Sequence, residues 1–351
     1  MTVVGARPQF IKAAPLGRAL AAAGHEELLI HTGQHYDEAM SASFFSELQI
    51  GEPMANLEVG GSPGPERIRA MLDGLLAFIE TRKPDAVVVL GDTDSTLAGA
   101  LAASLSATPL AHVEAGLRSF DRRMPEERNR VITDHCAQLL LCPSETARAN
   151  LTAEGIEDGV HVVGDVMRDA MEDASARTGR ELLAEFGVTV GSYVLATIHR
   201  ADNTDDPLRL QAILNGLGGI DEPVVFPLHP RTGDAIEAAA LRVPPNVRCV
   251  EPVGYGTLIR LAADARVVVT DSGGLQKEAY WLGTPCVTAR DTTEWVETVE
   301  TGWNVLVGAD ADFIASAARA AGPGPTHPES YGEPGAGSRC VGLLEAFRRK
   351  K

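Results

Sequence analysis

Residues 109–118 of the chain read Pro-Leu-Ala-His-Val-Glu-Ala-Gly-Leu-Arg, a short apolar run that ends in a carboxylate. This pattern predicts a buried strand over residues 109–113 with Glu114 just beyond its carboxyl end. Asp92 has the same place after the preceding predicted strand, residues 86–90. Carboxylates gathered at strand ends are unfavourable to hold together unless cations or chemistry use them. Two more follow a few residues later, Glu126 and Glu127.

Short apolar runs alternate with longer amphipathic ones along the whole chain. Most of the short runs are continuously apolar, which is typical of parallel strands covered on both faces. The repetition predicts an α/β fold with parallel sheets. The expected strands are residues 2–4, 27–31, 86–90, 109–113, 139–142, 160–163, 193–197, 223–227, 247–250, 266–270 and 285–288, with helices between them, for example 65–81, 95–106 and 274–282.

The strand pattern is interrupted between residues 164 and 191, where charged helical residues appear. We therefore place a domain boundary near Asp165, with an N-terminal Rossmann-like domain over residues 1–165 and a C-terminal one over 166–335. Residues 336–351 are expected to form a helix that packs back on the first domain. Because ligands of open α/β sheets lie beyond the carboxyl ends of strands, we expect two Rossmann-like parallel-sheet domains facing a cleft.

The composition excludes several classes of partner. The net charge of −17 argues against nucleic acid, which requires a basic face, although a local basic cluster could still hold a small anion. The five cysteines are scattered without a CxxC pair, so we expect no disulfides or structural zinc, and a cytoplasmic location. The chain lacks a signal-peptide pattern and an apolar run of roughly 20 residues, so no membrane association is expected.

Two glycine-containing turns predict anion binding. The first, Gly5-Ala6-Arg7-Pro8, follows a strand and begins a helix with free N–H groups, and Arg7 and Lys12 add positive charge. The second, Ser272-Gly273-Gly274, has the same strand–loop–helix context. Glu278 lies one turn further on, where it could accept hydrogen bonds from a ribose diol.

Each of these signals also has a structural interpretation. The turns are compatible with ordinary helix starts, with Glu278 favouring the helix dipole. His199 and His229 each end a strand beside an arginine, which favours anion binding, although a histidine at a strand end is more often structural. The carboxylates could instead be caps and surface ion pairs. Neither GxGxxG after a strand nor GxxxxGK[ST] occurs, so we expect no dinucleotide cofactor, and no metal is expected.

Taken in order, the motifs resemble the non-hydrolysing UDP-N-acetylglucosamine 2-epimerase family. The resemblance covers most of the chain and implies the two-domain GT-B fold, with UDP bound by the C-terminal domain. It also implies reversible C2 inversion of UDP-N-acetylglucosamine to UDP-N-acetylmannosamine, by elimination and re-addition of UDP through a 2-acetamidoglucal. The matching stretches are Gly5–Pro8, Gly91–Thr93, His112–Arg118, Pro125–Arg130, Thr197–Arg200, Asp271–Gln276 and Arg290–Glu294.

The resemblance implies roles for individual residues. Asp92, Glu114 and Glu126 are expected to be the catalytic carboxylates, and His199 a catalytic or diphosphate-contacting residue. A homodimer is the expected assembly, and a UDP-linked 2-acetamido sugar the expected partner. With His229 added from the strand-end pattern, the expected ligands of this UDP-sugar are Arg7, Lys12, His229, Ser272, Gly273, Gly274 and Glu278.

Some positions depart from the family pattern. Gln9 replaces a common glutamate, and Trp295 replaces an arginine. The stretch Gly5–Lys12, with Gln34-His35-Tyr36 and Met40-Ser41, looks closer to a branch acting on UDP-2,3-diacetamido-2,3-dideoxyglucuronic acid. A hydrolysing UDP-N-acetylglucosamine 2-epimerase and a GT-B UDP-sugar glycosyltransferase are the other enzyme hypotheses. A nucleotide-sugar-binding protein without turnover is the non-enzymatic one.

Overall fold

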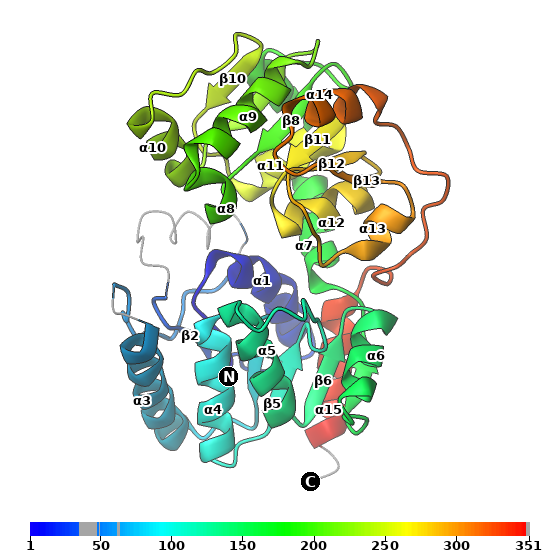
Figure 1. Ribbon diagram of the computed structural model, residues 1–351. Coiled ribbons are helices and arrows are strands. Elements are labelled where there is room, and N and C mark those ends of the chain that lie inside the picture. The colour runs from blue at the N-terminus through cyan, green and yellow to red at the C-terminus, as the bar shows by residue number, and fades with distance from the viewer. Residues whose placement is uncertain (35–47, 49, 62–63, 349–351) are drawn as a thin grey trace. The chain divides into compact units, whose positions relative to one another are not determined.

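A computed structural model of the protein describes residues 1–34, 48, 50–61 and 64–348, apart from the side chains of Arg7 and Arg348 (Figure 1). His35, Tyr36, Met40 and Ser41 therefore lie outside the described residues. The chain forms two compact units. Unit 1 combines Met1–Ala170 with Glu329–Lys351, and unit 2 is Met171–Pro328.

Unit 1 contains a parallel sheet whose seven described strands have the order β3-β2-β1-β4-β5-β6-β7. The chain runs from β1 to β2 in one direction and from β4 to β5 in the other, so right-handed connections place α1 and α4 on opposite faces. Its elements are β1 (Thr2–Val4), α1 (Arg7–Ala22), β2 (Leu29–His31), β3 (Ala55–Asn56), α3 (Gly64–Arg82), β4 (Val87–Leu90), α4 (Asp94–Leu105), β5 (Leu110–Val113), α5 (Pro125–Cys136), β6 (Leu139–Cys142), α6 (Glu145–Ala153), β7 (Val160–Val162), the start of α7 (Val166–Arg177) and α15 (Ala336–Arg348).

Unit 2 repeats the design with a six-stranded parallel sheet of order β10-β9-β8-β11-β12-β13. After the end of α7 it comprises the 3-10 helix η1 (Arg180–Phe186), β8 (Val194–Thr197), α8 (Ala201–Thr204), α9 (Pro207–Gly218), β9 (Val224–Pro227), α10 (Pro230–Ala238), β10 (Val247–Val250), α11 (Tyr255–Asp264), β11 (Val267–Thr270), α12 (Gly273–Leu282), β12 (Cys286–Thr288), α13 (Val296–Glu300), β13 (Asn304–Leu306) and α14 (Ala311–Ala320).

Strand β11 shows why these runs are continuously apolar. Val267 and Val269 belong to a core that includes side chains of α9 and α14. Val268, between them, belongs to a second core with side chains of α11 and α12. Because successive side chains of a strand point to opposite faces, a sheet covered on both sides needs apolar residues at every position. The prediction of two parallel-sheet α/β domains is confirmed.

All the strands expected from the sequence are present, with ends shifted by at most two residues. Two strands were not expected, β3 and β13. Both are edge strands, and they are only two and three residues long, which leaves little apolar pattern to recognise.

Helix α15 packs against α1 and β6 within unit 1. His25, just after the end of α1, contacts Glu345 of α15, with 3.0 Å between Nε2 and Oε1. We propose that the two units are the domains expected from the sequence and that α15 completes the first. None of the helices in the described ranges combines the length and hydropathy of a transmembrane span.

We predict that Gly116→Ala destabilises the protein more than Gly155→Ala. Both glycines have a left-handed backbone conformation, with φ of 80° at Gly116 and 79° at Gly155. An added Cβ at Gly116 would lie 2.3 Å from the carbonyl oxygen of Ala147, whereas nothing lies within 4 Å at Gly155. We expect a loss of about 1–2 kcal/mol at Gly155 from backbone strain alone, and roughly 2 kcal/mol more at Gly116. Denaturant unfolding followed by circular dichroism measures both, and equal losses would contradict the prediction.

Candidate active site

The carboxyl edge of the unit 1 sheet brings Asp92 and Glu114 together. Strands β4 and β5 pair in parallel with Leu90 opposite Val113, so the residues that follow them share one edge. Glu114 Oε2 accepts a hydrogen bond from Lys12 Nζ, and Asp92 Oδ2 accepts one from Arg130 Nη2. Each carboxylate at this edge therefore has its own cation, one from α1 and one from α5.

Burial and charge act in opposite directions on both cations. Burial would lower the pKa of Lys12, but the carboxylates of Glu114 and Asp92 outweigh it and raise that pKa. Arg130 is likewise held charged, because Asp92 and Glu127 outweigh its burial and raise its pKa. About 28% of the Asp92 side chain stays exposed, against 8% for Glu114, so Asp92 is the more accessible of the two to a ligand.

The backbone of Glu114 has a φ of 72°, a conformation that residues with a side chain rarely adopt. Its N–H and that of Ala115 both donate to the carbonyl of Leu141 on β6, at 3.0 and 3.2 Å. Residues held in sparsely populated backbone regions cluster at functional sites, where the surrounding structure enforces them. The strained turn directs Glu114 toward Lys12.

The two glutamates of α5 differ in their surroundings. Glu127 is buried and accepts hydrogen bonds from Ser119 N and Oγ and from Phe120 N, all at 2.9 Å. It therefore holds the loop before the helix. Glu126 is exposed in the first turn of α5, and no hydrogen bond or ion pair within the described ranges joins it to Asp92 or Glu114. Asp92 and Glu114 therefore share the strand-end edge, and Glu126 lies on α5, the helix that also supplies Arg130.

The Gly5–Lys12 turn is built around Gln9, which the sequence analysis noted only as a departure. Its Oε1 accepts from the N–H groups of Gly5 and Ala6, at 2.8 and 3.1 Å. Its Nε2 donates to the carbonyl of Leu90, at 2.9 Å, and so ties the turn to the end of β4. A glutamate could accept in the same way, but it could not donate unless protonated. Arg7 begins α1, and its side chain lies outside the described part of the structure.

A buried carboxylate behind the edge stabilises the loop that carries Glu114. Asp134 Oδ2 accepts from Arg118 Nη1, at 2.7 Å, and from the N–H of Gly116, at 3.2 Å. Arg118 also donates to both carboxylate oxygens of Glu154, at 2.7 Å each. Burial would raise the pKa of Asp134, but the charges of His112 and Arg118 outweigh it and lower that pKa. Asp134 is thus held ionised in the core.

At the carboxyl edge of the unit 2 sheet, Asp271 organises the turn at His199. This carboxylate is fully buried and accepts from the N–H groups of His199, at 3.0 Å, and Arg200, at 2.9 Å, and from Asn203 Nδ2, at 3.0 Å. The rings of His199 and His229 lie 5.5 Å apart. His229 Nδ1 also accepts from the N–H of Arg231, at 3.2 Å, and so caps α10. The two predicted histidines therefore lie side by side.

Ser272, Gly273 and Gly274 form the start of α12, as the sequence predicted. An added Cβ on Gly273 would lie 2.5 Å from Oε1 of Glu294, so a larger residue there would displace this carboxylate from the helix start. Arg290 Nη2 is 2.9 Å from Glu294 Oε2. Burial would raise the pKa of Glu294, but Arg290 outweighs it and lowers that pKa. This edge therefore offers a helix N-terminus lined by ionised side chains.

Glu278 and Trp295 contact residues that the sequence analysis did not identify. Glu278 is buried in α12, and its Oε1 accepts from Tyr255 Oη at 2.7 Å. Lys277 Nζ lies 3.8 Å from the ring centroid of Trp295, a cation–π contact. Trp295 thus covers a buried lysine beside the Ser272–Gly274 turn. Neither Tyr255 nor Lys277 has a sequence motif that could have marked it.

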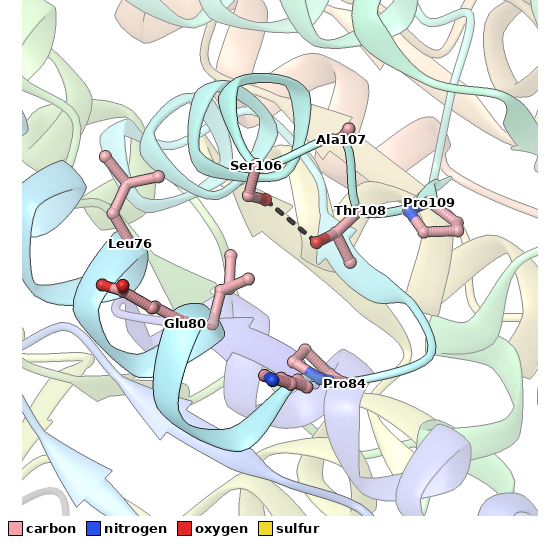
Figure 2. A pocket seen from close by; sticks show the side chains of 9 residues that line it. Leu76, Glu80, Pro84, Ser106, Ala107, Thr108 and Pro109 are labelled. Atoms are coloured by element: carbon pink, nitrogen blue, oxygen red, sulfur yellow. Dashed lines mark hydrogen bonds between the residues drawn. The ribbon is translucent and has the colours of Figure 1, made fainter.

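A pocket of about 520 Å³ opens at the other end of the unit 1 sheet, where β4 and β5 begin (Figure 2). Ser106 Oγ and Thr108 Oγ1 form a hydrogen bond of 2.9 Å in its wall. None of the predicted site residues lines this pocket, so it is separate from the candidate site. Within the described part of the chain, no group of three or more His, Cys, Asp or Glu side chains is arranged to hold a metal ion.

Comparisons with known proteins agree on one family. The family model described as UDP-N-acetylglucosamine 2-epimerase matches residues 18–345. The UDP-N-acetylglucosamine 2-epimerase homolog of Methanococcus maripaludis is 45% identical over 99% of both chains. The UDP-2,3-diacetamido-2,3-dideoxy-D-glucuronate 2-epimerase of Pseudomonas aeruginosa is 46% identical over 91% of both. The crystal structure of Methanocaldococcus jannaschii UDP-GlcNAc 2-epimerase in complex with UDP-GlcNAc and UDP has a TM-score of 0.90 at 40% identity, and covers 98% of this chain and 99% of that one.

We predict that Asp134→Asn lowers the free energy of unfolding at pH 7 by about 3–5 kcal/mol, because it removes one partner of a buried ion pair. The pKa of Asp134 is lower in the folded chain than its ordinary value of 3.8. Its contribution is therefore fully present above that ordinary value and is lost as the pH falls through the folded one.

Urea unfolding from pH 7 down to pH 3 measures this difference, with the exposed Asp158→Asn as the matched control. The gap between wild type and Asp134→Asn should narrow in acid, and the control should stay close to wild type throughout. A gap that widens on acidification would contradict the assignment of Asp134 as an ionised, stabilising group.

Proposed function

The chain belongs to the UDP-N-acetylglucosamine 2-epimerase family, and we propose that it inverts C2 of UDP-N-acetylglucosamine reversibly to give UDP-N-acetylmannosamine. The observation that carries the proposal is the pair Asp92 and Glu114, which lie at neighbouring strand ends and each contact a partly buried cation. An acid and a base beside one reacting carbon are what such an inversion requires.

The chemistry of the sugar explains why two carboxylates and an anion site are needed. The hydrogen on C2 has no adjacent carbonyl to stabilise a carbanion, so simple deprotonation is unfavourable. Loss of UDP together with the C2 proton leaves a 2-acetamidoglucal, and the return of UDP with a proton on the opposite face of C2 completes the inversion. One carboxylate removes the proton, another group returns it, and the departing diphosphate must be stabilised.

We assign the proton-transfer roles to unit 1. Lys12 and Arg130 donate hydrogen bonds to Glu114 and Asp92, which supports a role for these two carboxylates as positioned proton-transfer groups. Lys12 was expected to contact UDP, but its contact with Glu114 supports a role in holding that carboxylate. Glu126, exposed in the first turn of α5, remains a proposed third carboxylate.

We assign the diphosphate and ribose to unit 2. The start of α12 presents free N–H groups at Ser272–Gly274, and a helix N-terminus favours an anion. His199 and His229 lie side by side at the same edge of the sheet. Glu278, oriented by Tyr255, has a second carboxylate oxygen that could accept from the ribose diol. Arg7, whose side chain is outside the described residues, stays a proposed ligand.

A second substrate is favoured by specific observations. The relative from Pseudomonas aeruginosa, 46% identical, is named for UDP-2,3-diacetamido-2,3-dideoxy-D-glucuronate, and the stretch Gly5–Lys12 resembles that branch of the family. Epimerisation of that diacetamido uronate is therefore our alternative. We further propose that the enzyme is a homodimer and works in the cytoplasm, and the five unpaired cysteines support the cytoplasmic location.

We predict that the protein epimerises UDP-N-acetylglucosamine in D2O without an added nicotinamide cofactor. Proton NMR should show the manno product and loss of the C2 proton signal, because the proton removed by the base exchanges with solvent. The diacetamido uronate, incubated in parallel, decides between the two substrates. Inversion with complete retention of the original C2 hydrogen would contradict elimination. Free UDP with a free sugar would indicate hydrolysis, and consumption only with an acceptor would indicate glycosyl transfer.

We predict that Asp92→Asn, Glu114→Gln and Glu126→Gln each lower kcat by about 10²–10⁴, as expected for loss of a positioned acid or base. Their affinity for UDP should stay near that of the wild type. His199→Ala should weaken UDP binding as well as turnover. Kinetics and titration calorimetry measure the two effects, with the exposed Glu157→Gln as the control. Loss of UDP affinity in the carboxylate variants, with a fully active His199→Ala, would reverse the assignment.

A further inference from the structure

His112 lies in β5, two residues before Glu114, and its side chain is completely buried. Its two ring nitrogens have different partners. Nδ1 is 2.6 Å from Asp134 Oδ1, on α5. Nε2 is 2.7 Å from the carbonyl oxygen of Gly91, the residue before Asp92. The imidazole therefore bridges helix α5 and the turn that carries one of the two candidate carboxylates.

Both partners of the imidazole can only accept a hydrogen bond. A backbone carbonyl has no hydrogen to give, and an ionised carboxylate has none either. Asp134 is ionised, because its other oxygen already accepts from Arg118 Nη1 and from the N–H of Gly116. Each ring nitrogen must therefore carry a hydrogen, which makes the ring an imidazolium.

The charges around the ring balance. His112 and Arg118 supply two positive charges, and Asp134 and Glu154 supply two negative ones, linked by hydrogen bonds of 2.6–2.7 Å. A buried charge is tolerated when it is paired and hydrogen-bonded in this way. A neutral imidazole would leave one ring nitrogen facing an acceptor with no hydrogen between them, which is costly for a buried pair.

This network holds both sides of the candidate site. On one side, His112 fixes the Gly91 carbonyl in a left-handed turn with φ of 65°, and Asp92 follows directly. On the other, Asp134 holds the N–H of Gly116, two residues after the strained Glu114. The hydrogen bonds Gly91–His112–Asp134–Gly116 therefore set the position of Asp92 relative to Glu114.

We propose that His112 is a positioning residue, held as a buried imidazolium, that fixes the Gly91–Asp92 turn against the Glu114 loop. Its kinetic consequence rests on the proposed epimerase function, whereas its protonation does not. A histidine inside an apolar strand is usually a structural residue, so the sequence around His112 does not mark this role.

The protonation is tested directly by NMR of the intact protein labelled with 15N at its histidines. At pH 8, His112 should show N–H correlations at both ring nitrogens, and these should vanish in His112→Gln. Burial slows their exchange with water, so they should remain visible. A ring nitrogen of His112 with the shift of an unprotonated imine at pH 8 would overturn the proposal. This measurement uses the wild type and stands even where a variant fails to fold.

The positioning role is tested with two variants that each keep one donor. The side-chain amide of His112→Gln can reach the place of Nε2 and donate to Gly91, whereas that of His112→Asn takes the place of Nδ1 and donates to Asp134. We expect His112→Asn to lower kcat by about 10²-fold, since a small misplacement of a reacting group has an effect of that size. His112→Gln should keep roughly tenfold more activity, the effect of one hydrogen bond. KM should change less than threefold in both variants, which is less than the effect of losing one typical hydrogen bond to the substrate.

The exposed His161→Gln on β7 is the matched control and should leave kcat and KM unchanged. Equal kcat in His112→Gln and His112→Asn, or a loss confined to KM, would contradict a role through Gly91. A wild type that turns over neither UDP-sugar would refute the proposed function alone, since the NMR result would still decide the state of His112.

Discussion

The parallel register of β4 and β5 is the constraint on which the candidate site depends. Leu90 pairs with Val113, and the N–H of Gly91 continues the ladder to the carbonyl of Val113. The chain has no freedom to separate the residues that come next, so Asp92 and Glu114 must share one edge. Two carboxylates at one edge repel each other. Lys12 from α1 and Arg130 from α5 offset this repulsion by pairing with Glu114 and Asp92. The strand register that places the two carboxylates at one edge therefore also requires Lys12 and Arg130 beside them.

Unit 2 uses the same edge in a different way. Thr197 pairs with Thr270, so Asp271 follows β11 at the place where the chain turns into His199. Here the Asp271 carboxylate accepts hydrogen bonds from the N–H groups of His199 and Arg200 and so stabilises the turn that they form. What faces outward is a pair of histidines and the start of a helix. One architecture therefore carries the proposed acid–base groups on one sheet and the proposed anion-binding groups on the other, and the difference lies in what each strand-end carboxylate is hydrogen-bonded to.

Much of this was predictable from the sequence, for identifiable reasons. The apolar runs predicted the central strands because a sheet covered on both faces repeats one simple signal, whereas β3 and β13 are too short to carry it. Asp92, Glu114 and the Ser272–Gly274 turn were found because they follow strands directly. The partners of these residues were not predictable: Gln9, Tyr255 and Asp134 act through contacts across 16 to 81 positions of the chain. The contact of Lys12 with Glu114 likewise depends on how α1 crosses the sheet.

The order of the segments along the chain has a consequence for biosynthesis. Helix α15 is made after α1, on which it packs, and all of unit 2 is translated between them. On the ribosome, unit 2 can complete its own sheet while α1 still lacks its neighbour. Ala336, Cys340 and Val341 of α15, whose side chains are buried in the folded protein, are synthesised only after unit 2. The nascent chain therefore passes through a long stage in which one half is finished and the other has an uncovered apolar surface, a state in which aggregation competes with folding.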